Sequence, residues 1–342
     1  MITRGGFEDL LEPSWNLALN KIGVRSELFN SHSFTLPGFL GRIERRILFG
    51  PGVARIKRNL IRRVKKDQPD VTLFYQGHYF DRETLEIIRP YTFITGYHDD
   101  DPTGPHRSML RYRHLLPALS CYQGYHVIRA PNLGEFMESG VPRVKLLRHS
   151  YRPWLHFPVS LNSSDQRKWG GDIVFVGHWE DDMRVDCLSK AIGAGVKVRI
   201  FGGERYWKSA FPSEIYSKIK PVPKIFGEEY RKALCGAKIA VGFLSKWNRD
   251  DHGMRSFEIP ACGVFLLSER TAVMKELYEE GREAEFFSSS EEFLDKVRYY
   301  LKHDEKRRNI AQAGYQRVIS SGYDIYSRMR QWVVDVEQWR SG

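Results

Sequence analysis

The chain has 342 residues, of which 42% are hydrophobic and 28% are charged. These proportions are those of a globular protein of about two domains, and they exclude disordered, collagen-like and coiled-coil chains. No apolar run approaches the ~20 residues that a membrane-spanning helix requires, and the N-terminus lacks the apolar core of a secretory signal. The four cysteines, Cys121, Cys187, Cys235 and Cys262, form no CxxC pair. They therefore predict neither a disulfide framework nor a zinc site, which is typical of a reducing cytoplasm.

The N-terminus is irregular for an α/β chain. Gly5 and Gly6, followed by an apolar-periodic stretch over 7–19, are typical of the turn and helix after a first strand. Residues 1–4 are too short for a buried strand. Either the sheet lacks that strand or the true start lies upstream of Met1, and we favour the second interpretation.

The net charge of +11 is concentrated in residues 41–66. This segment carries ten Lys and Arg against one acidic residue, Glu44, a net charge of +9 that leaves +2 for the rest of the chain. Two sets of residues recur at helical spacing on different faces: an apolar set (Val53, Ile56, Leu60, Val64) and a basic set (Arg55, Arg58, Arg62, Lys65). The protein is therefore a nearly neutral globule with one basic helical segment.

The basic segment has three interpretations. A helix of this kind can lie on an anionic membrane surface, on the inner face of the membrane. Nucleic acid is the competing polyanion, but no aromatic residues are interleaved with these cations for stacking, and no binding module is recognisable. A helix that packs by its apolar stripe and leaves its basic face in water explains the pattern equally well. We therefore expect an anionic membrane surface as a candidate partner, and no specific nucleic acid.

Short apolar runs alternate with helical patterns along the rest of the chain. The runs predicted as strands are 71–77, 91–98, 125–130, 143–150, 172–179, 196–203, 238–244, 263–269 and 284–289. Several are continuous Val, Ile, Leu and Phe runs, as expected for strands covered on both faces. Helical patterns at 228–237, 271–281 and 291–303 lie between them. This alternation predicts parallel sheets with crossover helices. Residues 151–170 are aperiodic and hold two prolines, so they predict a linker between two α/β units.

The sequence lacks several common catalytic signatures. GxxxxGK[ST], GxGxxG, GxSxG and HExxH are all absent, which excludes P-loop NTPases, ordinary dinucleotide enzymes, elbow-type serine hydrolases and zincins.

The densest polar group follows the predicted strand 238–244, where ligands bind in open α/β sheets. Its members are Lys246, Asn248, Arg249, Asp250, Asp251 and His252. A helix is predicted from about Met254, with Arg255 and Glu258 on one face and Gly263 at its end. Backbone NH groups and cations at such a turn suit a diphosphate, and the carboxylate one turn on suits sugar hydroxyls. A solvated loop with an Arg255–Glu258 surface pair is the alternative, but the number of functional groups favours a binding site.

Two further polar groups follow predicted strands. Gly177, His178 and Arg184 surround the turn after strand 172–179, although an exposed helix start rich in acidic residues explains the pattern equally well. After strand 91–98 come Asp99, Asp100 and Asp101, which contain a DxD pattern suited to a divalent cation. Asp-Asp-Pro is also a common turn. We favour a role in handling the acceptor of a transferred group, or a proton, over a metal site.

Taken together, these residues resemble the GT-B glycosyltransferases, most closely the group that contains the spore-maturation protein CgeB. The resemblance covers roughly 171–330 and rests on DIVFVGHWEDDMR, IFGGERYW, IAVGFLSKWNRDDHGMRSFEIPACGVFLLSER and AGYQRVISSGYDIYSRM. HDDDP and RHSYRPWLHFP add a weaker likeness. It implies an α/β GT-B fold, two Rossmann-like domains facing across a cleft with C-terminal helices returning to the first. The implied domains are 1–152 on the acceptor side, a linker at 153–170, a nucleotide-sugar domain at 171–314, and C-terminal helices at 315–342.

The resemblance also implies an activity, transfer of a sugar from a nucleotide-diphosphate donor (EC 2.4) to an unknown acceptor. No cofactor is expected besides the nucleotide-sugar co-substrate, and the transfer is expected to be metal-independent. Related retaining transferases place an acidic residue eight positions before a donor-site glutamate, and Asp250 and Glu258 hold that spacing. By resemblance Glu258 would bind the ribose, while Asp250 and His252 would contact the donor sugar. If retention does not apply, Asp99 or Asp100 is the candidate base.

The family's diphosphate cations are the least well matched residues. Family members carry an Arg and a Lys six positions apart, where this chain has His178 and Arg184. Arg184 and Arg255 are therefore the expected cations, with Lys246 or Arg249 as substitutes. Two other functions stay open: a GT-B-fold sugar-nucleotide epimerase, and a non-catalytic protein of envelope or spore-coat assembly.

Overall fold

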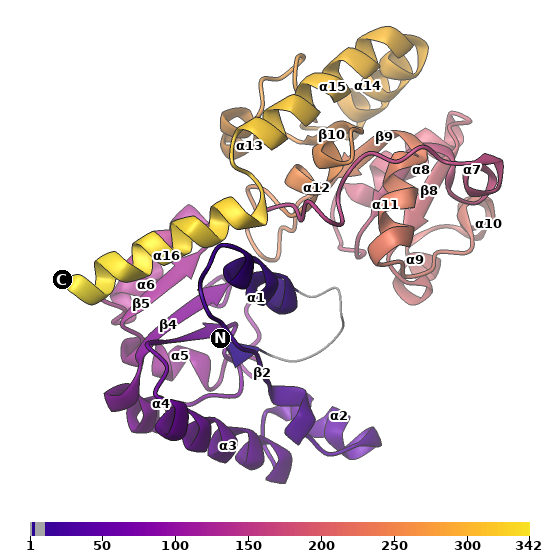
Figure 1. Cartoon of the computed structure of the whole chain (residues 1–342). Helices are drawn as coiled ribbons and strands as arrows, with labels where there is room; N and C mark the ends of the chain where they lie inside the picture. Colours follow the sequence, from indigo (N-terminus) through magenta and orange to yellow (C-terminus); the bar gives the residue numbers. More distant parts are fainter. Residues whose placement is uncertain (1, 4–10) are drawn as a thin grey trace. The chain divides into compact units, whose positions relative to one another are not determined.

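The computed structural model describes residues 2–3 and 11–342. The chain divides into two compact units, each built on one parallel sheet (Figure 1). Unit 1 comprises Met1–Arg148, Trp247–Arg249 and Ile325–Gly342, and unit 2 comprises His149–Lys246 and Asp250–Asp324. The predicted class of parallel α/β units is therefore confirmed.

Unit 1 has a six-stranded sheet of order β2-β1-β3-β4-β5-β6. Its strands are β1 (Ile2–Thr3), β2 (Phe29–Asn30), β3 (Val71–Tyr75), β4 (Phe93–His98), β5 (Gly124–Val127) and β6 (Val144–Leu146). Its α-helices are α1 (Leu11–Lys21), α2 (Gly38–Ile47), α3 (Pro51–Asp67), α4 (Arg82–Ile88), α5 (Leu115–Ala118), α6 (Ala130–Glu138) and α16 (Ile325–Ser341). Short 3-10 helices are η1 (Ser31–Phe34), η2 (Arg89–Tyr91) and η3 (Leu119–Cys121).

The first strand differs from the expectation. Ile2 and Thr3 pair in parallel with Phe29 and Asn30 of β2, and Ile2 also pairs with Phe74 of β3. Two residues are enough to form a strand here because β1 lies between two partner strands. Neither β1 nor the equally short β2 is long enough to show a periodicity in the sequence. The predicted turn at Gly5-Gly6 lies outside the described residues.

Unit 2 has a five-stranded sheet of order β11-β10-β9-β7-β8. Its strands are β7 (Gly171–Val176), β8 (Val198–Phe201), β9 (Ala237–Gly242), β10 (Phe265–Glu269) and β11 (Glu285–Phe287). Its helices are α7 (Ser163–Trp169), α8 (Arg184–Gly193), α9 (Glu204–Ala210), α10 (Ser213–Ile219), α11 (Gly227–Cys235), α12 (Arg255–Ala261), α13 (Ala272–Leu277), α14 (Ser290–Lys302) and α15 (Asp304–Ser320). Every strand predicted between 71 and 289 is present in one of the two sheets.

The strands of unit 2 send alternate side chains into two separate cores, which explains their continuous apolar sequences. On β7, Val174 and Val176 enter one core while Ile173 and Phe175 enter the other. Burial on both faces removes the apolar–polar alternation of a half-exposed strand. Residues 151–170, predicted as a linker, lie in unit 2, where α7 ends on the buried Trp169.

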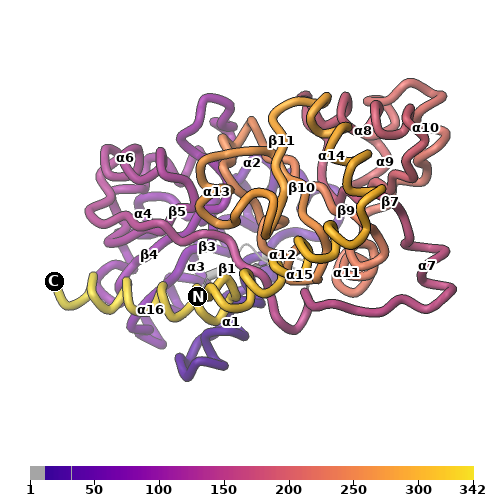
Figure 2. The backbone as a smooth tube through the Cα atoms, turned by 90° about the horizontal axis from the view of Figure 1, so that it is seen from above, coloured from indigo at the N-terminus to yellow at the C-terminus, as the bar shows by residue number. Residues whose placement is uncertain are grey.

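The C-terminal helices belong to different units. The helix α15 lies in unit 2, and the chain passes through Gly322, with φ of +67°, before α16 joins unit 1. The helix α16 lies along α1 (Figure 2), and Asp335 accepts hydrogen bonds from His126 Nε2 (3.1 Å) and Lys145 Nζ (2.6 Å). The predicted return of the C-terminus to the first unit is confirmed, and it begins at Ile325.

Candidate functional site

The carboxyl ends of β7 and β9 lie side by side in unit 2, because these two strands pair directly. The loops that follow them are therefore neighbours: the Lys246 backbone donates to Glu180 (3.2 Å), and Arg255 Nε donates to the carbonyl of Val176 (3.2 Å). The two polar groups predicted after these strands thus belong to one candidate site.

Glu258, on α12, is the centre of this site and is only 3% exposed. Its Oε2 accepts from the hydroxyl of Tyr230 (2.7 Å), and its Oε1 lies 3.5 Å from His156 Nε2 and 3.6 Å from Arg152. The guanidinium of Arg255 is 4.0 Å away. Burial opposes ionisation of Glu258, but the neighbouring charges and the Tyr230 hydrogen bond lower its pKa to about 2. The group is therefore a carboxylate at every physiological pH.

Three of these neighbours were not among the predicted site residues. Arg152 and His156 belong to the passage predicted as a linker, where the backbone of Arg152 donates to His156 Nδ1 (3.0 Å). Their only signal in the sequence is the weak likeness of RHSYRPWLHFP to the related enzymes. Tyr230 lies on α11, where its spacing is that of an ordinary core residue. All three are recognised as site residues only by their proximity to Glu258, which is distant from them in the sequence.

Arg184 is engaged in the local structure of unit 2. Its side chain is 4% exposed, with Nε and Nη2 each 2.7 Å from Asp182 and Nη1 2.5 Å from the carbonyl of His178. Asp182 thereby joins the turn after β7 to the start of α8. This geometry favours the alternative interpretation, in which the polar residues around Gly177 and His178 stabilise a helix start, over the diphosphate role expected for Arg184.

Lys246, which was expected as a substitute diphosphate cation and lies in unit 2, is also paired. Its Nζ forms an ion pair with the buried carboxylate of Glu269 on β10. In the same loop, Asp251 Oδ1 lies 2.5 Å from Nδ1 of the buried His252. The backbone of Asp250 donates to the carbonyl of Ser245 (2.9 Å), which brings Asp250 back towards the end of β9.

Two cations at this edge keep the capacity to meet an anion. Arg255 is about one-third exposed, and its closest carboxylate is 4.0 Å away. Lys224, which was not predicted, is exposed and has no ion-pair partner among the described residues. It follows Pro223, whose carbonyl accepts from the backbone of Gly202 (3.0 Å) just after β8. Burial, Arg255 and Lys224 all lower the pKa of His178, so both cations lie in its surroundings.

The GG pair after β8 allows two strand ends to approach closely. Gly202 has φ of +157°, and a Cβ there would lie 1.9 Å from the carbonyl oxygen of Gly177. A Cβ on Gly203 would meet the side chain of Lys224 at 3.1 Å. A side chain at Gly202 would therefore clash with the backbone at the end of β7, so glycine is required there, and Lys224 lies beside Gly203.

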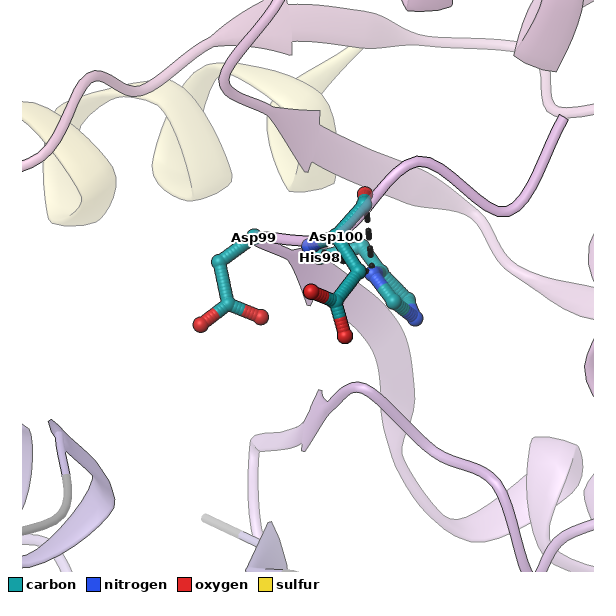
Figure 3. A group of neighbouring side chains, drawn as sticks. All are labelled: His98, Asp99 and Asp100. Atoms are coloured by element: carbon teal, nitrogen blue, oxygen red, sulfur yellow. Dashed lines mark hydrogen bonds between the residues drawn. The ribbon is translucent and has the colours of Figure 1, made fainter. Parts of the chain in front are cut away.

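A second polar group lies in unit 1 at the carboxyl end of β4. His98, Asp99 and Asp100 occupy it, with their ligand atoms within 4.8 Å of one another (Figure 3). Asp99 accepts from the Tyr75 hydroxyl and from Gln76 Nε2 (2.5 Å) at the end of β3. Three such groups could hold a divalent cation. The Asp99 carboxylate, however, is already satisfied by neutral donors.

Asp100 has a cationic partner, since Arg111 lies 2.5 Å from its carboxylate. The backbone NH of Asp100 donates to His98 Nδ1 (3.1 Å), and burial lowers the pKa of His98 to about 4. His98 is therefore a neutral imidazole at pH 7. The role in handling the acceptor or a proton, which the sequence favours for this group, stays a prediction.

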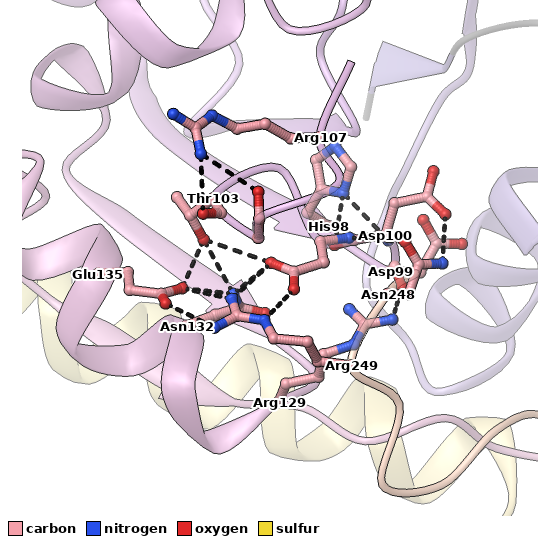
Figure 4. A network of polar contacts seen from close by, with 12 residues as sticks. His98, Asp99, Asp100, Thr103, Arg107, Arg129, Asn132, Glu135, Asn248 and Arg249 are labelled. Carbon is pink, nitrogen blue, oxygen red and sulfur yellow. Dashed lines mark hydrogen bonds and ion pairs between the residues drawn. The ribbon is translucent and has the colours of Figure 1, made fainter. Parts of the chain in front are cut away.

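Arg249 and Asn248 lie in unit 1, in contrast to the neighbouring Asp250. Figure 4 shows both side chains within a network of polar contacts. The Arg249 guanidinium contacts Asp101 at 2.5 Å and 2.9 Å and Glu135 at 2.8 Å and 2.9 Å. Hydrogen bonding to Arg249 lowers the pKa of Glu135 to about 2. Both the Arg249 guanidinium and Asp101, the second aspartate of the DxD pattern, are thus occupied. The expected role of Arg249 as a diphosphate cation is not supported by these contacts.

The buried histidines predict a pH dependence of stability. Burial lowers the pKa values of His98 and His156 to about 4, whereas the unfolded chain protonates near 6.5. Between these values only the unfolded state binds the proton, so stability is full above pH 6.5 and falls as the pH drops towards 4. Urea denaturation at pH 7 and pH 5 measures how much unfolding free energy the protein loses between these values. In His98→Gln or His156→Gln this loss should be about 2 kcal/mol smaller than in the wild type. An unchanged loss in both variants would contradict neutral buried imidazoles.

Two parallel-sheet units of Rossmann type, with the last helix returning to the first unit, define a GT-B fold. Residues 184–333 match the family model described as glycosyl transferase-like. This match adds the activity class: the chain is a glycosyltransferase, EC 2.4. The narrower resemblance to the CgeB group stays a prediction.

Solved structures resemble the chain over most of its length. HepE of Anabaena, in complex with UDP and glucose, is 14% identical with a TM-score of 0.62, over 95% of this chain and 89% of that one. Sucrose-phosphate synthase of Thermosynechococcus elongatus is 11% identical with a TM-score of 0.69, over 99% and 95%. A glycosyltransferase of Rickettsia africae is 10% identical with a TM-score of 0.61, over 99% and 89%. No curated protein matches the sequence significantly.

Proposed function

We propose that the protein transfers a sugar from a nucleoside-diphosphate sugar to an acceptor and that unit 2 holds the donor. The observation that carries this proposal is the buried carboxylate of Glu258, placed beside Arg255 at the carboxyl edge of the sheet. Such an edge is where open α/β sheets bind ligands. Oε1 of Glu258 lies 3.5 Å from His156 Nε2 and 3.6 Å from Arg152, so it keeps the capacity to accept from the ribose hydroxyls.

The leaving diphosphate needs positive charge, and we assign this role to Arg255 and Lys224. Because α12 has only seven residues, the side chains rather than the helix dipole must supply most of that charge. Two cations at the position of a departing phosphate can stabilise it without a metal ion. Asp250 and His252, in the loop that precedes α12, are proposed to contact the donor sugar.

The acceptor side is proposed to lie in unit 1, at the end of β4. Asp99 receives hydrogen bonds from Tyr75 and Gln76, an arrangement that fixes its carboxylate for contact with a hydroxyl group. In an inverting reaction Asp99 or Asp100 would accept the acceptor proton. In a retaining reaction the departing phosphate itself can take that proton.

The donor is tested by thermal unfolding in a panel of UDP-, GDP- and ADP-sugars. Because Anabaena HepE has been solved with UDP-glucose, UDP-glucose is the first donor to test. A ligand present at 100 times its Kd stabilises the folded state by about 2.7 kcal/mol, which gives a measurable rise in Tm. We expect selective stabilisation by one nucleotide class, followed by release of the nucleoside diphosphate. No response to any nucleotide would contradict the proposal and favour an assembly protein.

An epimerase is the alternative that uses the same donor site. It would stabilise with a nucleotide sugar but interconvert two nucleotide sugars without releasing the sugar. Chromatography of the reaction mixture separates these outcomes, because only transfer or hydrolysis yields free nucleoside diphosphate.

A further inference from the structure

None of the helices in the described chain is both long and apolar enough to cross a membrane. The helix α2 is nevertheless the site of an exposed apolar group. Phe39 is 67% exposed, Leu40 63% and Ile43 38%, and Phe49, just after the helix, is 67% exposed. Phe39 and Ile43 lie one turn apart, and Leu40 is adjacent to Phe39. Four large apolar side chains within eleven residues are unusual on a solvated surface and indicate an interaction site.

Basic side chains accompany this apolar group. The Arg42 guanidinium lies 5.8 Å over the ring of Phe39, and Arg46 is exposed one turn further along the helix. On the following helix α3, Arg55, Arg58 and Arg62 are exposed and form no ion pair within the described residues. Exposed apolar side chains on α2 and exposed arginines on α2 and α3, unpaired within the described part of the chain, thus lie on two helices that contact each other.

The single acidic residue of the segment does not reduce this charge at the surface. Glu44 is 5% exposed and accepts from the backbone NH groups of Gly52 (2.8 Å) and Leu36 (3.3 Å). Its carboxylate joins α2 to the first turn of α3. Every charged side chain that α2 exposes is thus basic.

The structure changes which helix of the segment can meet a membrane. The apolar stripe of α3 (Val53, Ile56, Leu60, Val64) is at most 3% exposed and packs in the core of unit 1. The structural alternative is thus correct for α3, whose apolar face is unavailable to lipid. The apolar group on α2 includes Phe39 and Leu40, which lie outside the basic segment recognised from sequence.

We propose that α2 docks unit 1 on an anionic bilayer, with Phe39, Leu40, Ile43 and Phe49 inserted among the lipids. The exposed arginines of α2 and α3 would lie against the anionic headgroups. Helices with this combination of apolar and cationic side chains lie in the membrane interface. A second copy of the chain fits less well, because two basic segments would repel each other. The aliphatic Leu40 and Ile43 offer no stacking surface to a nucleic acid base.

The proposal is tested by flotation of the full chain with vesicles of phosphatidylcholine, alone or mixed equally with phosphatidylglycerol. We expect binding to the mixed vesicles and little to the neutral ones. Phe39→Ser/Leu40→Ser should weaken binding to mixed vesicles at least about tenfold, because burial of each side chain contributes to affinity. Arg42→Gln/Arg46→Gln should also weaken binding to the mixed vesicles at low salt. The binding that remains should fall less steeply as salt is raised than that of the wild type, since less of the attraction is electrostatic.

The matched control is Met137→Ser/Val334→Ser, which alters two exposed apolar residues on α6 and α16 of the same unit. It should bind as the wild type does, and all variants should keep the wild-type Tm because the residues are exposed. Equal binding by the α2 variant and the control would overturn the proposal. A dimer seen by sedimentation and abolished only by the α2 variant would also overturn it. So would RNA that displaces the chain from vesicles, if the α2 variant bound the vesicles as tightly as the wild type. These outcomes do not depend on donor turnover, so failure here leaves the proposed transferase activity intact.

Discussion

Replacement of Glu258 by Gln is expected to lower kcat/KM for the nucleotide-sugar donor by about 100-fold or more. The substitution keeps the shape of the side chain but removes the negative charge that would accept from ribose, and such charged hydrogen bonds contribute about 1.5–3 kcal/mol each. It also leaves Arg152 and Arg255 without their carboxylate, which should reduce the free energy of unfolding by about 3 kcal/mol. Initial rates and urea denaturation measure the two effects separately.

Glu285 provides a matched control for this substitution. It is also buried, at 5% exposed, accepts from the hydroxyl of Tyr300 (2.6 Å) and pairs with Lys296, but it lies on the edge strand β11. Glu285→Gln should cost comparable stability while leaving kcat/KM unchanged. If the two variants lost activity equally, Glu258 would be a structural residue and the assignment of the donor site would fail.

Replacement of Arg255 by Ala is expected to lower kcat/KM by about 100-fold, with the loss mainly in kcat. The reason is that charge develops on the diphosphate as it leaves, and a cation placed there stabilises the transition state by about 3 kcal/mol. Arg255→Lys should recover part of the rate, because it restores the charge but not the planar donor geometry. Steady-state kinetics with the donor selected in the thermal panel give both parameters.

Arg184→Lys distinguishes this role from that of the arginine favoured by sequence spacing. Lys cannot reproduce the paired contacts with Asp182, so the variant should unfold about 1–2 kcal/mol more easily. The folded enzyme should keep a kcat/KM close to the wild type, because Arg184 is buried and already paired. A large loss of kcat in the Arg184 variant, with little in Arg255→Ala, would reverse the two assignments.

Much of the candidate site was predictable from strand ends. Loops after 172–176 and 238–242 carry unusual numbers of polar residues, and parallel strands bring their carboxyl ends to one edge of a sheet. The structure brings the two loops together: Arg255 donates to the carbonyl of Val176, and burial and Arg255 both lower the pKa of His178. Reasoning from strand ends could not select among cations, because Arg184, Arg249 and Lys246 look equally available in the sequence. Their carboxylate partners, Asp182, Asp101, Glu135 and Glu269, lie at separations with no common spacing.

The basic segment shows the same division. Its charge and its two helices follow from composition and spacing alone. Which apolar residues remain exposed was not predictable, because α3 packs its stripe into the core and α2 does not. Periodicity reports that a helix has an apolar face, and only packing against other elements decides whether that face is covered.

The sequence by itself determined the two parallel α/β units and the concentration of charge in one segment. It did so because strand-length apolar runs and helical spacing are local properties of the chain. The tertiary structure decided that Arg152, His156 and Tyr230 surround Glu258, that Arg249 is occupied in unit 1, and that Lys224 and Arg255 keep their charge available. These outcomes depend on which side chains meet through space, and an ion pair between residues over a hundred positions apart leaves no periodic trace in the sequence.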